Sequence, residues 1–264
     1  MKPLQKYFLL AAILFCSHSL LMAQRTAAVA IDGSTVNIDN LVMQDSAAGN
    51  RLFYSASFTF NITDGVDLQK ILNSLQVAHI KNTTVGLSII YSGGINPSAT
   101  ERKYSAATVM QMTASKLEAA GRSAFKMEVK IRSAQLTEIA NVNIKSSPAA
   151  RTLLAYNFRI EIPGIATDRI AVVSGLELRT NPLISFEISM ADIASWQQWI
   201  GSPGKKINGS IFMLAPNMRD RIKVFQLVSM ELVSITQTIN PNEERAQRFT
   251  ALVRPAMLVL DEVK

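Results

Sequence analysis

Apolar and polar residues alternate in several short stretches of this chain, which is the pattern of strands with one buried face. The clearest examples are residues 58–63, 158–162 and 186–189. Further strands are predicted at residues 209–214, 222–233 and 249–260, with turns at residues 201–204, 215–217 and 240–242. Many strands joined by short polar turns favour an antiparallel sheet that curls into a sandwich or a barrel.

Two segments follow the helical period instead, one after each of two Phe-containing strands. Their apolar stripes consist of Leu68, Ile71, Leu72 and Leu75 in the first segment and Ile193, Trp196 and Ile200 in the second. Asp64 or Asp67 would cap the first helix and Asp192 the second. We expect each helix to lie against a sheet, with Leu68, Ile71, Leu72 and Trp196 buried.

The order of these elements occurs twice. A Phe-containing strand, an amphipathic helix, a Gly-led strand, a long strand and a closing strand appear first at residues 60–62, 68–72, 86–90, 104–109 and 125–129, and again at residues 186–188, 196–200, 209–212, 225–230 and 249–253. The two sets are about 121 to 128 positions apart throughout. Two related modules in tandem explain this constant order better than chance, and such a duplication usually builds symmetric architecture.

The N-terminal residues 1–23 have the features of a bacterial signal peptide: Lys2 and Lys6, then an apolar stretch, then a small residue, Ala23, at the cleavage position. A membrane anchor is the alternative, but the apolar run is shorter than the roughly 20 residues that a spanning helix needs. We therefore predict export to the periplasm or the cell exterior. No later segment resembles a membrane span.

The mature chain is predicted to comprise residues 24–147 as a first, divergent β-barrel module and residues 148–264 as a second. The boundary is placed at residues 146–148, a Ser-Ser-Pro sequence between two strand-rich regions. The only cysteine, Cys16, lies in the signal peptide, so disulfides cannot hold these modules. About 120 residues each is enough for a stable core.

The basic excess is modest. Of 27 lysines and arginines, Lys2 and Lys6 are lost with residues 1–23, which leaves 25 against 20 acidic residues and a net charge of +5. The densest clusters are Lys205 with Lys206, and Arg219, Arg221 and Lys223. Clusters of two or three like charges are usually solvated, so no specific nucleic-acid binding is predicted.

Few residues of the mature chain offer catalytic or metal-binding chemistry. His79 is its sole histidine and it has no cysteine, so a Cys-His pair is excluded and a Cys/His metal cluster cannot form. A histidine between a helix and a strand usually serves packing or the surface. Trp196 and Trp199 could form a ligand platform, but on an amphipathic helix at least one of them is expected to be a core residue. We predict no catalytic residue, no cofactor, no metal site and no enzyme activity.

The second module resembles a known family. Residues 157–165 (NFRIEIPGI) and 173–177 (VSGLE), with the elements that follow to residue 262, are similar to contractile-phage tail-tube proteins and to the haemolysin-coregulated tube protein of type VI secretion. The first module matches only through the internal repeat. The resemblance implies small antiparallel barrels, each flanked by one helix, that join edge to edge into six-fold rings and tubes. Two barrels in one chain would let three chains complete such a ring.

Two functions follow as hypotheses. The first is an exported, non-catalytic structural subunit that assembles with itself into a ring or tube, with an unknown exported partner. The alternative is a secreted or periplasmic binding or adhesive module that uses the same barrel without polymerising, which the signal peptide favours because tube proteins of these machines are normally assembled in the cytoplasm. A ring former needs strand edges that can pair, whereas a monomer should block them with charge or proline.

Overall fold

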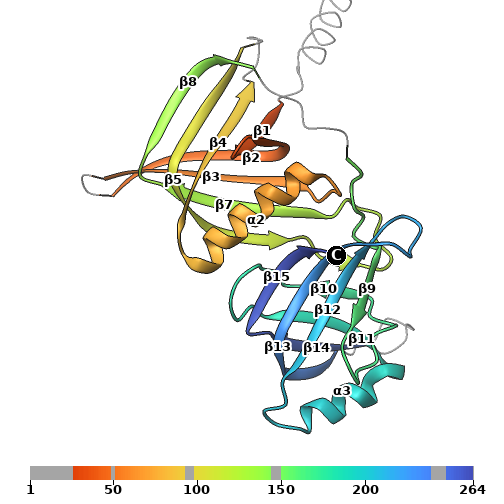
Figure 1. Cartoon of the computed structure of the whole chain (residues 1–264). Helices are drawn as coiled ribbons and strands as arrows, with labels where there is room; N and C mark the ends of the chain where they lie inside the picture. Colours follow the sequence, from red (N-terminus) through yellow and green to blue (C-terminus); the bar gives the residue numbers. More distant parts are fainter. Residues whose placement is uncertain (1–25, 49–50, 93–97, 144–149, 239–247, 264) are drawn as a thin grey trace, which may run out of the picture.

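The computed structural model describes residues 26–48, 51–92, 98–143, 150–238 and 248–263. Within these residues the chain forms two barrel-like antiparallel sheets, each accompanied by one α-helix (Figure 1). The predicted class, mainly β with two tandem barrel modules, is confirmed. The predicted signal peptide and the predicted boundary between residues 147 and 148 lie outside the described residues.

The first module is a closed barrel. Its strands are β1 (Ala27–Ile31), β2 (Ser34–Ala48), β3 (Arg51–Asn61), β4 (Thr84–Ser92), β5 (Ala99–Ala114) and β7 (Lys126–Ser133), with helix α2 (Val66–Lys81) between β3 and β4. The order β1-β2-β3-β7-β5-β4 returns to β1 because β4 pairs with both β5 and β1. A further strand, β8 (Leu136–Val142), pairs with the first part of β5, outside this ring.

The second module is nearly closed. Its elements are β9 (Phe158–Glu161), β10 (Val172–Ser174), β11 (Ile184–Ser189), the 3₁₀ helix η1 (Met190–Asp192), α3 (Ile193–Ile200), β12 (Ile207–Leu214), β13 (Arg221–Thr238), β14 (Arg248–Arg254) and β15 (Met257–Glu262). The order is β10-β11-β14-β13-β12-β9, with β15 beside the first part of β13. Among the described residues β9 and β10 do not pair with each other.

The second module repeats the topology of the first, as the sequence repeat predicted. The path β2-β3-β7-β5-β4-β1 corresponds strand by strand to β10-β11-β14-β13-β12-β9, and the helix follows the same strand in both. The extra strands correspond as well, because β8 follows β7 and pairs with β5 just as β15 follows β14 and pairs with β13. The predicted single strand over residues 249–260 is thus two strands, separated by Pro255 and Ala256.

Both helices bury the predicted apolar side, with one correction. Leu68, Ile71, Leu72 and Leu75 of α2 are at most 2% exposed, and Trp196 of α3 is fully buried. Ile200, however, is 39% exposed, and Trp199 takes its place in the core. Ile200 is the last residue of α3, where the chain turns away at Gly201. The indole nitrogens of Trp196 and Trp199 donate to the backbone oxygens of Ala166 and Lys205, at 2.9 and 3.1 Å, so both tryptophans serve packing.

The predicted aspartate cap of α2 is wrong, and the predicted cap of α3 is right in position only. The N-cap residue of α2 is Gly65, and Asp192 occupies the N-cap position of α3 without a side-chain hydrogen bond to the helix. Instead, the Ser189 hydroxyl accepts a hydrogen bond from Ala191 N at the start of η1, which inserts a short turn ahead of α3.

Among the described residues, no helix has both the length and the apolar character needed to cross a membrane.

Replacing Leu72 by alanine should lower the free energy of unfolding by about 2–5 kcal/mol, because it removes buried methyl groups and leaves a cavity between α2 and the sheet. Val77→Ala is the matched control on the same helix, since Val77 is 48% exposed. Its effect should stay within about 0.5 kcal/mol. Urea unfolding of the two variants measures the difference, and equal stabilities would contradict the packing of α2.

Candidate functional site

The joint between the two modules begins with backbone pairing. Ala114 N at the end of β5 donates to Leu176 O at 2.9 Å, and Leu178 N donates to Met112 O at 2.9 Å, on either side of an antiparallel bridge between Thr113 and Glu177. Leu176 and Leu178 are fully buried. The connection between β10 and β11 therefore covers the outer edge of a first-module strand.

Other segments cross the joint in both directions. Strand β6 (Leu117–Glu118), which lies between β5 and β7 in the sequence, pairs with β10 of the second module. Conversely, Leu153 N donates to Ile62 O and Phe125 N donates to Leu153 O, each at 2.8 Å. Phe125 packs edge-on against Phe225 with 5.9 Å between ring centroids. The two modules thus share one apolar core.

Helix α2 covers the outer edge of β15. The Gln76 side chain accepts a hydrogen bond from Leu260 N at 2.8 Å and donates to Leu260 O at 3.5 Å. Gln76 is 6% exposed. Its amide thus takes the place of a neighbouring strand, which satisfies backbone groups that would otherwise be buried without partners.

A buried cation lies beside this contact. Lys223 of β13 is fully buried, and its ammonium group donates to Gln69 Oε1 of α2 and lies 3.1 Å from Glu262 Oε1 of β15. Removal from water lowers the pKa of Lys223, and the bond and charge of Glu262 oppose this effect. The sequence analysis placed Lys223 in a solvated basic cluster with Arg219 and Arg221, and this is wrong for Lys223 alone, because the other two are exposed.

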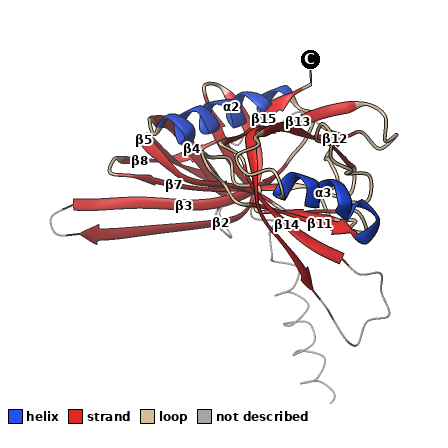
Figure 2. Ribbon diagram, turned by 90° about the horizontal axis from the view of Figure 1, so that it is seen from below, coloured by secondary structure: helices blue, strands red, loops and turns tan. Residues whose placement is uncertain are grey.

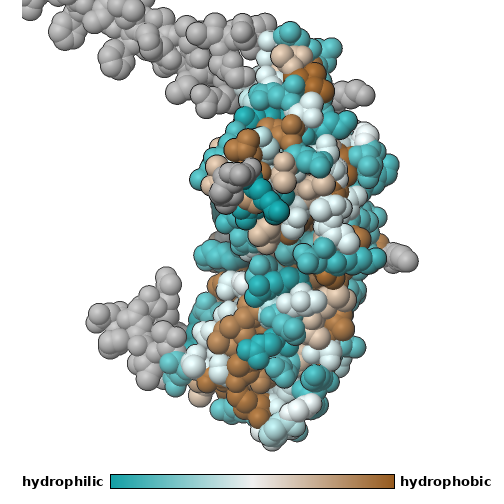
Figure 3. Space-filling view, turned by 90° about the vertical axis from the view of Figure 1, so that its left-hand side faces the viewer, coloured by the Kyte–Doolittle hydropathy of each residue, from teal (hydrophilic) through white to brown (hydrophobic). Residues whose placement is uncertain are grey.

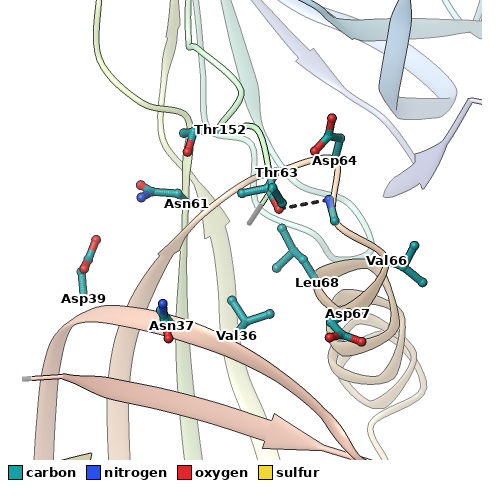
Figure 4. A pocket seen from close by; sticks show the side chains of 12 residues that line it. Val36, Asn37, Asp39, Asn61, Thr63, Asp64, Val66, Asp67, Leu68 and Thr152 are labelled. Carbon is teal, nitrogen blue, oxygen red and sulfur yellow. Dashed lines mark hydrogen bonds between the residues drawn. The ribbon is translucent and has the colours of Figure 1, made fainter. Parts of the chain in front are cut away.

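The first barrel has a polar cleft at the N-terminal end of α2 (Figure 4). It has a volume of about 670 Å³ and is lined mainly by amide, hydroxyl and carboxylate groups from β2, from the end of β3 and from the segment that leads into α2. Two of its carboxylates are engaged in ion pairs: Asp39 with Lys126 at 3.4 Å, and Asp64 with Arg151 at 2.9 Å. The charges of Asp39 and Asp64 are therefore already balanced by cationic partners, while Asp67 is the third carboxylate in the lining.

A second polar cluster lies where β2, β4, β5 and β8 approach one another. Arg102 of β5 pairs with Asp45 of β2 at 3.2 Å and lies 3.8 Å from Glu138 of β8, and the Tyr91 hydroxyl donates to Glu138 at 3.3 Å. Burial raises the pKa of Tyr104, and burial together with Glu138 raises the pKa of Tyr91. This cluster ties the long β2–β3 hairpin to the body of the barrel.

Several strand edges have no strand partner among the described residues, and three of them bear on contacts with another chain. The first is the outer edge of β8, the second is β2 beyond Ile38, where its pairing with β1 ends, and the third is β13 beyond Met230, where its pairing with β12 ends. Among the described residues, no backbone hydrogen bond reaches these edges from outside. Figure 2 shows that the β2–β3 and β13–β14 hairpins both extend beyond the body of the molecule.

Apolar side chains are also exposed. Figure 3 shows hydrophobic residues gathered on one side of the second module. The large apolar side chains exposed in that module are Leu183, Met190, Ile200, Met218, Val228 and Val233. In the first module they include Val42 and Leu52 on the β2–β3 hairpin and Ile139 on β8. Apolar groups on open strand edges are features of a surface that binds another chain.

His79 serves the fold, since its Nδ1 lies 2.8 Å from Val109 O, between α2 and β5. Within the described part of the chain, no three His, Cys, Asp or Glu side chains gather in a way that could hold a metal ion. The sequence analysis missed Gln69 and Gln76 and misassigned Lys223, because the contacts of Gln69 with Lys223 and of Gln76 with Leu260 cross between the modules. Comparison with known proteins finds no matching family model and no matching curated protein.

Lys223→Met tests the buried cation through the pH dependence of stability. Because the folded protein lowers the pKa of Lys223 below its ordinary value of 10.5, the unfolded chain binds the proton more tightly. The wild type should therefore gain stability relative to Lys223→Met as the pH rises toward 10.5. Lys81→Met, at the exposed end of α2, is the control for loss of a lysine. Parallel melting temperatures of the wild type and Lys223→Met across this range would contradict the account.

Proposed function

We propose that the mature chain is a non-catalytic structural subunit that joins copies of itself head to tail, through contacts like those between its own two modules. One observation carries this proposal. The joint within the chain is heterologous, because α2 and the edge of β5 in the first module meet different elements, β15 and residues 176–178, in the second. The corresponding elements at the other ends are left uncovered by the described residues.

The first open counterpart is β8. Its equivalent in the second module, β15, has its outer edge covered by α2 through Gln76. No described residue covers the outer edge of β8. An uncovered strand edge is a template for pairing with another chain, and β8 contains no proline and only one charged residue, Glu138, to block it.

The second open counterpart is α3. In its apolar stripe Trp196 corresponds to Leu68, so Gln197 corresponds to Gln69, which holds Lys223 at the joint. Gln197 and its neighbour Gln198 are exposed. The match is one of elements rather than of every residue, because α3 has 8 residues where α2 has 16.

A repeated heterologous contact closes into a ring when the rotation per unit divides the circle, and otherwise forms a filament. In the tail-tube proteins that the second module resembles, six barrels close the ring, so we expect three two-barrel chains. The predicted signal peptide supports assembly after export, in the periplasm or outside the cell.

Light scattering on residues 24–264 at increasing protein concentration tests this function. We expect a molar mass of three chains, or a larger stacked species, and negative-stain images of closed rings or tubes. A species of one-chain mass at every concentration would reject self-assembly and would favour the alternative of an exported binding module. A compact dimer with two-fold symmetry would also reject it, because the two surfaces in a head-to-tail contact differ.

A further inference from the structure

We infer that residues 41–43 of one copy pair with residues 233–235 of β13 in the next copy, as an intermolecular version of the backbone pairing at the module joint. This inference rests on the proposed self-assembly and assigns part of its interface. The partner is a second copy of this chain.

Residues 40–43 are the counterpart of residues 175–178. Each segment begins with a residue of positive φ, Asn40 at 50° and Gly175 at 78°. Each begins at an interruption of strand pairing: the register between β2 and β3 shifts after Asp39, and the pairing between β10 and β11 ends at Ser174. In each segment two apolar residues then flank a central one: Leu41 and Met43 flank Val42, and Leu176 and Leu178 flank Glu177.

The two segments differ in what covers them. In the second module Leu176 and Leu178 are fully buried, because their backbone pairs with β5 of the first module. In the first module Leu41 and Met43 are only partly buried, and Val42 is 62% exposed. Residues 176–178 are therefore covered at the joint, whereas the corresponding residues 41–43 of the first module are left open.

The edge beside residues 41–43 has room for a partner. Pairing between β1 and β2 stops at Ile38, while β3 occupies only the other edge of β2. A cleft of about 580 Å³ lies next to this open edge, and its apolar lining includes Ile38, Leu41, Met43 and Tyr91. Apolar side chains of an added strand could enter this cleft while the backbones pair.

Residues 233–235 are the counterpart of the β5 segment that receives residues 176–178. Thr113 lies opposite Glu128 of β7, and Ser234 lies opposite Leu252 of β14, which are matching positions in the sequence repeat. Thr113 pairs across its other edge with Glu177, whereas the corresponding edge of β13 has no backbone partner among the described residues. Val233, next to Ser234, is 40% exposed.

The ion pair between Arg102 and Asp45 supports pairing at residues 41–43, because it positions the β2–β3 hairpin. Arg102 holds Asp45 two residues beyond Met43, with 16% of the Arg102 side chain exposed. The hairpin is thus fixed to β5 before a partner arrives, which reduces the entropy lost on binding. Arg102 would act as a positioning residue for the interface.

Cysteine crosslinking tests the assignment, because residues 24–264 contain no native cysteine. Val42→Cys and Ser234→Cys chains are mixed under oxidising conditions and run on a non-reducing gel. Thr113 and Glu177 lie directly opposite each other between two flanking hydrogen bonds, so Thr113→Cys with Glu177→Cys in one chain is the positive control. Val42→Cys mixed with Val77→Cys, an exposed position on α2, is the negative control.

We expect the mixture of Val42→Cys and Ser234→Cys to shift from one-chain to two-chain mass, while the Val42→Cys and Val77→Cys mixture stays at one-chain mass. If light scattering shows the assembly but the first mixture gives no more crosslinked product than the second, residues 41–43 do not pair with β13. In that case self-assembly stands and its interface lies elsewhere. A protein that stays monomeric overturns both proposals.

Discussion

The need to cover strand edges shapes this molecule more than any other constraint. The pairing of residues 112–114 with residues 176–178 joins the modules by extending a sheet of one barrel with a segment of the other. Unpaired backbone groups in a buried position cost free energy comparable to a lost hydrogen bond. Beside this pairing, β6 pairs with β10, and Phe125 packs on Phe225 in a shared core.

Polar side chains fix the geometry of the joint. Gln76 satisfies both backbone groups of Leu260, and Gln69 and Glu262 satisfy the buried ammonium of Lys223. Moving a charge out of water costs several kcal/mol, so Lys223 is tolerated only where both partners are in place. The joint therefore accepts one relative placement of α2 and β15, and a fixed angle between neighbouring units is what a closed ring of repeated contacts requires.

Local pattern and long-range pairing explain which parts of the structure the sequence predicted. Alternation and helical periodicity are local, so the strand order of the repeat and the burial of Leu72 and Trp196 could be predicted. The joint could not, because residues 112–114 and 176–178 are far apart in sequence and neither segment shows which partner it meets. Lys223 has the same charge as its exposed neighbour Arg221, and only the position of α2 of the other module distinguishes them.

A three-dimensional reconstruction of the species that residues 24–264 form in solution, by electron cryomicroscopy, tests the central claim most directly. The account predicts that the contact between neighbouring chains superposes on the joint within a chain, with α3 against β8 and the β2–β3 hairpin along β13. An assembly whose chains meet through a two-fold contact, or through surfaces that have no counterpart at the internal joint, would contradict it.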